Sequence, residues 1–322
     1  MKRPGSESGF TPEIKQQNTY EILANAETRE QLKERMLRFV KTVHDRHVDS
    51  MVFLDRSARP LSWMFQDLWD GMYKEEKRPE IKYVNIGTSS HVHKGVSDML
   101  QTAYFGAYSD AESIQNKIVE SEETDEWFTT KEIPKSWQRS MIEHAEVVNE
   151  LQSIFGKVFD GKSLLIVDEM MGQGKTLMAA AGFFALAFPQ TKEVEATGLF
   201  YSRQYHSRDR VFTDTTEDKK IIPWLQELGM AGVLELPDES LLSGTITKEQ
   251  TQKILPIVQT KIKELERDIA MYASKEDQAD LEKNLERKDL YEHPEKMIQR
   301  ARQLRKELKQ LASDALREKS EK

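Results

Sequence analysis

The stretch Ser163–Ala180, SLLIVDEMMGQGKTLMAA, decides the fold that the sequence predicts. Four consecutive apolar residues, Leu164–Val167, indicate a strand that is buried on both faces of a parallel sheet. Asp168 and Glu169 follow, where this strand is expected to end and a loop to begin at the carboxyl edge of the sheet. An apolar run from Leu177 then indicates a helix. This order of elements predicts an α/β domain with a ligand site at that edge.

The loop before this helix has the composition of a phosphate-binding loop. It consists of Gly172, Gln173, Gly174, Lys175 and Thr176. Two glycines let backbone N–H groups approach an anion, the threonine hydroxyl adds a donor, and the helix N-terminus supplies partial positive charge. These five residues are therefore candidate ligands of a phosphate group.

A nucleoside triphosphate P-loop is a competing interpretation, because Gly174, Lys175 and Thr176 complete the second half of that motif. The first half fails on spacing, since the motif requires a glycine five positions before Gly174 and Glu169 occupies that position. A carboxylate pair before a glycine-hydroxyl loop instead suits a ligand with vicinal hydroxyls and a phosphate, such as a ribose 5-phosphate unit. A strand, turn and helix that bind no ligand are the third interpretation.

The segment from Leu164 to Leu177 resembles the type I phosphoribosyltransferases. The motif of that family is a hydrophobic strand, two acidic residues, two or three mostly apolar residues and a Thr/Ser-Gly-x-Thr/Ser loop. The chain departs from it at Gln173, where the family usually has Thr or Ser, and at Gly172, where some purine-specific members have a catalytic Asp. The resemblance implies a doubly wound parallel sheet. It also implies transfer of a 5-phosphoribosyl group from phosphoribosyl pyrophosphate to an acceptor, with release of pyrophosphate.

The resemblance further implies roles for individual residues. Asp168 and Glu169 would hold the ribose 2′ and 3′ hydroxyls, and residues 172–176 would bind the 5-phosphate. Mg²⁺ would sit on pyrophosphate and ribose oxygens, with Asp168 and Glu169 as ligands directly or through water.

A second informative stretch is Ser50–Pro60, SMVFLDRSARP. Its apolar part predicts an early strand of the sheet, and Arg56 and Arg59 follow in the turn before a helix. Type I phosphoribosyltransferases place their pyrophosphate-binding loop after an early strand, and arginine side chains match phosphate oxygens bidentately. Arg56 and Arg59 are therefore expected to balance the charge of departing pyrophosphate. The alternative is that both arginines pair with surface carboxylates.

The remaining elements complete the predicted sheet, and one interval has two possible interpretations. An apolar stripe from Glu27 to His47 predicts a helix that covers the sheet. Further strands are predicted at 81–87 and 195–202. The interval 88–130 is polar and acidic, and it is either a lid that closes over substrate or a disordered segment.

Composition limits the classes of function. The 322-residue chain has a formal net charge of -8, which argues against general binding of nucleic acids or anionic membranes. The absence of cysteine excludes disulfides, thiolate metal sites and cysteine nucleophiles. No run approaches the ~20 apolar residues that span a bilayer, and the sequence MKRPGSESGF lacks the apolar region of a signal peptide. We therefore expect a cytoplasmic protein.

The predicted organisation has three parts. Residues 1–11 are expected to be a disordered lead-in, 12–245 a phosphoribosyltransferase-like α/β domain, and 246–322 a helical, coiled-coil-like extension. Two apolar runs in the extension alternate by four and three, which is heptad spacing and indicates two long helices, an antiparallel pair being the economical interpretation. Residues 248–322 are expected to join subunits of a homo-oligomer or to bind a helical partner.

A rival function belongs to another class. The chain would then be a non-catalytic sensor of phosphoribosyl pyrophosphate or nucleotides, or a scaffold, that keeps the fold and assembles through its C-terminal helices. Gln173 and an arginine loop without glycines favour this rival slightly. The acceptor of the enzyme hypothesis is not identified by the sequence.

Overall fold

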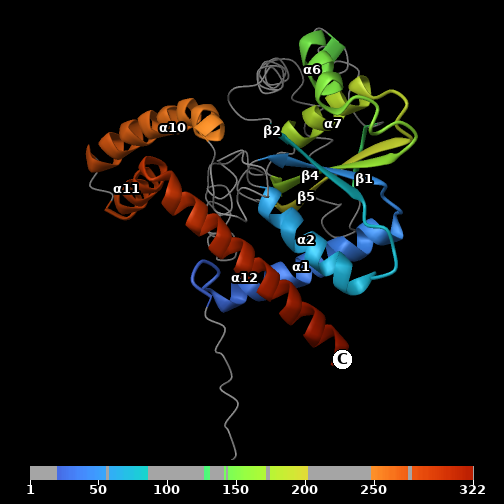
Figure 1. Cartoon of the computed structure of the whole chain (residues 1–322), viewed down its shortest axis with the longest axis horizontal. Coiled ribbons are helices and arrows are strands. Elements are labelled where there is room, and N and C mark those ends of the chain that lie inside the picture. Colours follow the sequence, from blue (N-terminus) through green and yellow to red (C-terminus); the bar gives the residue numbers. More distant parts are fainter. Residues whose placement is uncertain are drawn as a thin grey trace, which may run out of the picture.

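Four parallel strands form the centre of the domain (Figure 1). The computed structural model describes residues 20–55, 58–85, 127–130, 141–142, 144–171, 175–201, 248–274 and 278–321. Within them the parallel strands have the order β2-β1-β4-β5, with bounds β1 Ser50–Asp55, β2 Glu80–Asn85, β4 Ser163–Met171 and β5 Glu193–Tyr201. The short strand β3 (Phe128–Thr129) pairs antiparallel with the outer edge of β5. The predicted α/β fold with a parallel sheet is confirmed.

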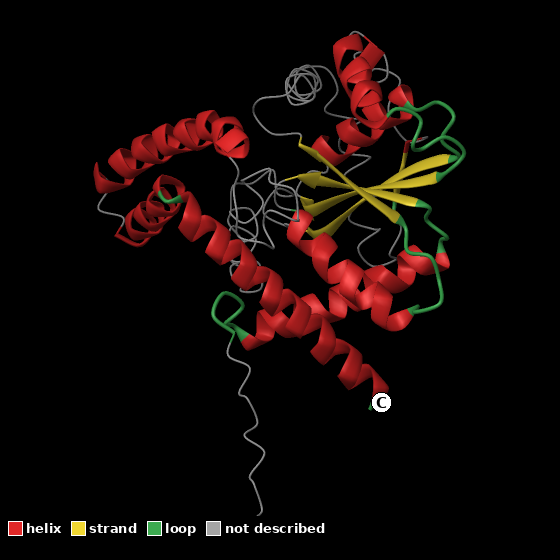
Figure 2. Ribbon diagram, viewed as in Figure 1, coloured by secondary structure: helices red, strands yellow, loops and turns green. Residues whose placement is uncertain are grey.

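Helices cover both faces of the sheet (Figure 2). One face carries α1 (Ala26–Asp45) and α2 (Arg59–Met72), and the other carries α6 (Ala145–Phe155) and α7 (Lys175–Ala187). Successive residues of β1 alternate between the two apolar clusters: Met51 and Phe53 pack with α1 and α2, whereas Val52 and Leu54 pack with α6 and α7. Because both faces are covered, the central strands β1 and β4 contain continuous apolar runs, at 51–54 and 164–167.

The ends of these elements follow from the local sequence. Asn25 caps α1, because its side chain accepts a hydrogen bond from the backbone N–H of Thr28 at 2.9 Å. Pro60 lies in the first turn of α2, where its missing N–H leaves no helical hydrogen bond unmade. Gly156 and Gly161 adopt positive φ values of 58° and 69° in the turns between α6 and β4, a conformation that glycine adopts without strain.

Strand β4 is longer than the sequence predicts. The prediction that the strand ends at Asp168 and Glu169 is wrong, because β4 continues to Met171. The added residues pair with β5, and the last pair is Met171 opposite Tyr201. Aromatic residues favour such strand pairing. The acidic pair therefore lies within a strand and is held by the sheet.

Three helices occupy the C-terminal residues that the structure describes, where the sequence predicts two. They are α10 (Lys248–Ser274), α11 (Gln278–Glu292) and α12 (Pro294–Ser320). α10 packs chiefly against α11, whereas α12 crosses α2 and α1 (Figure 1). Leu304, Leu308 and Leu311 of α12 are buried in the same apolar cluster as α1 and α2. The core on this face thus contains residues from both sides of the boundary that the sequence places at 246.

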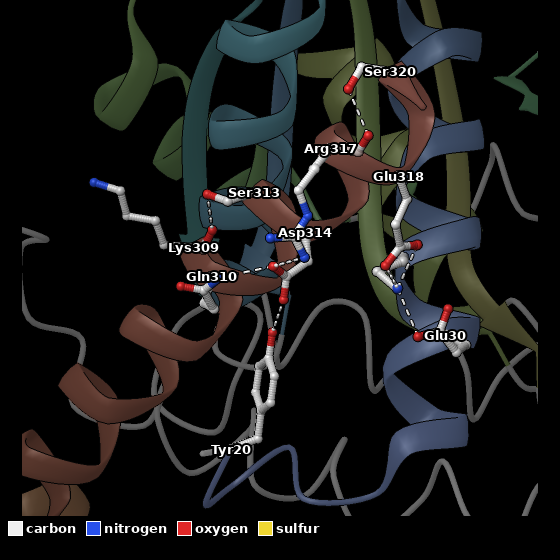
Figure 3. A network of polar contacts seen from close by, with 10 residues as sticks. Tyr20, Glu30, Lys309, Gln310, Ser313, Asp314, Arg317, Glu318 and Ser320 are labelled. Carbon is white, nitrogen blue, oxygen red and sulfur yellow. Dashed lines mark hydrogen bonds and ion pairs between the residues drawn. The ribbon is translucent and has the colours of Figure 1, made fainter. Parts of the chain in front are cut away.

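Polar contacts also fasten α12 to the N-terminal part of the chain (Figure 3). The Tyr20 hydroxyl donates to Asp314 Oδ2 at 2.8 Å, and burial together with this bond raises the pKa of Tyr20. Arg317 donates to the other oxygen of Asp314 at 3.2 Å. Lys33 of α1 lies 2.7 Å from a carboxylate oxygen of Glu318.

A buried carboxylate makes a further connection between the same segments. Glu307 of α12 is only 3% exposed. Its two oxygens accept hydrogen bonds from the backbone N–H groups of residues 21–23, at distances between 2.8 and 3.1 Å. The Gln303 side chain donates to Oε1 at 2.7 Å. Successive N–H groups that converge on one anion form a nest, so Glu307 holds this segment against α12.

No helix in the parts of the chain described here is long and apolar enough to cross a membrane.

Candidate ligand site at the carboxyl edge of the sheet

The strand order reverses between β1 and β4. The connection from β1 to β2 runs through α2 on one face of the sheet, and the connection from β4 to β5 runs through α7 on the other face. Such a reversal is a topological switch point. Open α/β sheets bind ligands there, in the crevice outside the carboxyl ends of the two strands.

The two central strands separate at this point. β1 and β4 pair as far as Phe53 and Val167. The pairing of β1 with β2 continues to Asp55, and that of β4 with β5 continues to Met171. Within the described residues, no residue of β1 pairs with Asp168 or with the rest of β4 beyond it. The sheet therefore opens at the first residue of the acidic pair.

Asp168 and Glu169 are both half-buried at this opening. Asp168 Oδ1 accepts a hydrogen bond from the backbone N–H of Glu169 at 2.9 Å. Burial raises the pKa of Asp168 well above its ordinary value, and the charge of Glu169 and a hydrogen bond with its side chain raise it further. Glu169 Oε2 is buried and has no hydrogen-bond partner among the described residues. A buried carboxylate oxygen without a partner, next to a second carboxyl group, favours a hydroxyl donor or a cation.

The candidate phosphate loop is described only in its second part. Gly172, Gln173 and Gly174 lie outside the described residues. Lys175 begins α7, and Thr176 is exposed in the first turn of that 13-residue helix. Thr176 therefore lies where the helix N-terminus carries partial positive charge, at the same edge of the sheet as the acidic pair.

The backbone geometry of β4 also bears on the P-loop interpretation. A P-loop would need residues 169–174 to form a loop around a triphosphate. Residues 169–171 instead belong to β4, which pairs with β5 as far as Met171. The structure thus agrees with the spacing argument against a triphosphate loop.

The structure describes one of the two candidate arginines. Arg56 lies outside the described residues. Arg59 is the first residue of α2, whereas the sequence predicts it in the preceding turn, and it is 8% exposed. Its guanidinium carbon lies 4.6 Å from the centre of the Tyr83 ring on β2. The sequence does not predict that Arg59 contacts Tyr83. The available signal was the position of Tyr83 in the predicted strand at 81–87, which follows the strand and turn that contain the arginines.

The described candidates all lie at the carboxyl edge, but they do not form one compact cluster. Asp168 and Glu169 lie on β4, Thr176 begins the helix that follows it, and Arg59 lies over β2. β1 separates β2 from β4, so the strand beneath Arg59 and the strand with the acidic pair are not neighbours in the sheet. The candidate site therefore has an acidic end and a cationic end.

Comparison with known proteins assigns no family to this arrangement. No protein-family model matches the chain, and neither a curated protein nor a solved structure matches it.

Proposed function

We propose that this protein binds phosphoribosyl pyrophosphate with Mg²⁺ and transfers its 5-phosphoribosyl group to an acceptor. The observation that carries the proposal is the acidic pair, Asp168 and Glu169, at the opening between β1 and β4. Two carboxylates suit two vicinal hydroxyls, and the nearby N-terminus of α7 suits a phosphate. The resemblance of the segment from Leu164 to Leu177 to type I phosphoribosyltransferases supports the same ligand.

The two ends of the site match the two ends of this ligand. The carboxylates of Asp168 and Glu169 would accept hydrogen bonds from the ribose hydroxyls, and residues 172–176 would bind the 5-phosphate. Arg59, which lies over β2, would bind the diphosphate.

Mg²⁺ fits the donor chemistry of these residues. It prefers oxygen ligands and is usually held by one or two carboxylates together with water and substrate phosphates. Asp168 and Glu169 supply carboxylate oxygens, and Oε2 of Glu169 has no partner among the described residues. In that part of the chain no group of three or more His, Cys, Asp or Glu side chains forms a metal site. The ion would therefore need substrate oxygens as further ligands, and when bound it would neutralise charge on the diphosphate.

The transfer step places specific demands on these side chains. The bond between C1 of the ribose and pyrophosphate breaks while a bond forms between C1 and the acceptor. The electron pair of the broken bond leaves on pyrophosphate, and the proton of the acceptor is lost to solvent. Arg56 and Arg59 would stabilise the charge that develops on the leaving group, because fixed donors act most strongly where charge appears. The acidic pair would hold the ribose in a fixed orientation.

A non-catalytic sensor of the same ligand is the second candidate function. Gln173 replaces the Thr or Ser that is usual in the resembled family, and Arg59 is packed against Tyr83 instead of lying in a glycine-rich loop. A sensor would bind phosphoribosyl pyrophosphate through the same residues but would release no pyrophosphate.

Two measurements on the full chain separate these functions. Calorimetry would measure binding of phosphoribosyl pyrophosphate in the presence of Mg²⁺. A coupled assay would measure pyrophosphate release with purine, pyrimidine and amine acceptors and with water. Binding with release supports the enzyme, and binding without release supports the sensor. If the chain does not bind the ligand, both functions are wrong.

A further inference from the structure

We infer that Tyr83 is a positioning residue, which holds Arg59 at the cationic end of the site. Arg59 and Tyr83 are distant in the sequence, and they come into contact only because α2 packs over β2. The inference rests on the proposed function, because it takes Arg59 as a ligand of the diphosphate.

The first contact is between the guanidinium and the aromatic ring. Arg59 Cζ lies 4.6 Å from the ring centre of Tyr83, within the ~6 Å range over which a cation is attracted to an aromatic face. The ring of Tyr83 therefore helps to fix the position of the Arg59 guanidinium through this cation–π contact.

A chain of hydrogen bonds makes the second contact. The Ser62 hydroxyl donates to the backbone carbonyl of Arg59 at 2.6 Å, and its oxygen lies 2.8 Å from the hydroxyl oxygen of Tyr83. A carbonyl only accepts, so the single hydroxyl proton of Ser62 is committed to Arg59. The Tyr83 hydroxyl must then donate to Ser62. Tyr83 thus supports both the backbone and the guanidinium of Arg59.

Burial and strand register add to this restraint. Ser62 is fully buried and Arg59 is 8% exposed, so neither side chain has many alternative positions. Tyr83 pairs with Phe53 on β1, and Phe53 pairs with Val167, the residue before Asp168. Tyr83, which contacts Arg59, therefore lies level with the residue before the acidic pair. An arginine fixed before the ligand arrives loses less conformational entropy on binding.

A packing role alone is the alternative, in which Tyr83 stabilises α2 but has no effect on the ligand through Arg59. A double-mutant cycle separates the two roles, because only positioning makes the effect of Tyr83 depend on Arg59. The probe is Mg²⁺-pyrophosphate, the product of the proposed reaction. Calorimetry measures its affinity for the full chain carrying Tyr83→Leu, Tyr83→Phe, Arg59→Ala, or Tyr83→Leu with Arg59→Ala.

The expected pattern is specific to the two contacts. Tyr83→Leu removes the ring face and should weaken binding about 3- to 30-fold in the wild-type background. It should weaken binding less than about 2-fold when Arg59 is already alanine. Tyr83→Phe keeps the ring and should restore most of the affinity. Tyr73→Leu is the control, because Tyr73 stacks on His44 with 3.9 Å between ring centres, in a contact that includes neither Tyr83 nor Arg59. It should leave the affinity unchanged.

The other outcomes would contradict either the inference about Tyr83 or the proposed function. Equal effects of Tyr83→Leu in both backgrounds would show that Tyr83 does not act through Arg59. If Arg59→Ala leaves the affinity unchanged while phosphoribosyl pyrophosphate still binds, the inference and the proposed role of Arg59 are wrong, while the proposed ligand stands. If the wild type binds neither ligand, the proposed function fails and the inference fails with it.

Discussion

The Glu307→Gln variant keeps the shape of a buried side chain and removes its charge. Among the described residues, the wild-type carboxylate accepts five hydrogen bonds, four from backbone N–H groups of residues 21–23 and one from Gln303. The amide of glutamine offers one oxygen, and its NH₂ group would face an N–H donor. The bond from the buried N–H of Leu23 would therefore be lost or replaced by a repulsive contact when the amide oxygen faces residue 21.

The magnitude follows from these bonds. Hydrogen bonds to charged groups contribute about 1.5–3 kcal/mol each, and an unsatisfied buried donor costs about 1–3 kcal/mol. The substitution also removes the desolvation penalty of a buried charge, which offsets part of the loss. We therefore expect the free energy of unfolding to fall by about 2 kcal/mol. With a urea slope of about 3 kcal/mol/M, the midpoint of unfolding should fall by about 0.7 M.

The assay is urea unfolding followed by circular dichroism, with hydrogen exchange as a local measurement. Glu321→Gln is the matched control, because Glu321 is exposed at the C-terminal end of α12, and its effect should stay within about 0.5 kcal/mol. The amide of Leu23 should lose protection in the Glu307 variant. A midpoint within about 0.2 M of the wild type would refute the conclusion that this carboxylate joins α12 to the domain.

Two further predictions concern contacts of the helices α1, α2 and α12. Hydrogen bonds with Asp45 and Glu76 raise the pKa of His44, so its contribution to stability is complete below its ordinary pKa and is lost as pH rises through the raised value. Urea midpoints should show that His44→Asn destabilises the protein more at pH ~5.5 than at pH ~8.5, and equal effects would contradict this. A Cβ on Gly71 would overlap the side chain of Leu316, so Gly71→Val should cost about 1–3 kcal/mol. In the Leu316→Ala background, Gly71→Val should lose most of its destabilising effect, because the overlapping side chain is gone. If the two substitutions destabilise the protein additively in thermal unfolding, Gly71 and Leu316 are not in contact.

The sheet could be predicted because its signals are local. The apolar runs at 51–54 and 164–167 indicate strands buried on both faces, and the residues in the structure alternate between two apolar clusters. The acidic pair could also be predicted to lie at the carboxyl edge, because it directly follows such a run. The position of the pair inside a strand could not be predicted, since β4 continues to Met171 only because β5 is long enough to pair with it.

Contacts between distant segments account for most of what the sequence did not reveal. Heptad spacing at 297–315 indicates an apolar stripe on a helix but not what covers it, and in the structure α1 and α2 cover it. The helix α11 has few apolar residues in a regular stripe, so its periodicity gave no signal. The contact of Tyr83 with Arg59 could not be predicted, because an aromatic residue in a strand ordinarily indicates core packing. Association of the chain through residues 248–322 remains a prediction, which light scattering would test.

The affinity of the acidic-pair variant for phosphoribosyl pyrophosphate tests the central claim most directly. Calorimetry in the presence of Mg²⁺ would compare the wild type, the double variant Asp168→Asn with Glu169→Gln, and Asp160→Asn. Asp160 is the control because it is an exposed carboxylate in the turn before β4. Each lost charge-assisted hydrogen bond is worth about 1.5–3 kcal/mol, so the double variant should bind at least about 100-fold more weakly, while Asp160→Asn should bind like the wild type. Equal affinity of the double variant and the wild type would contradict the assignment of this site.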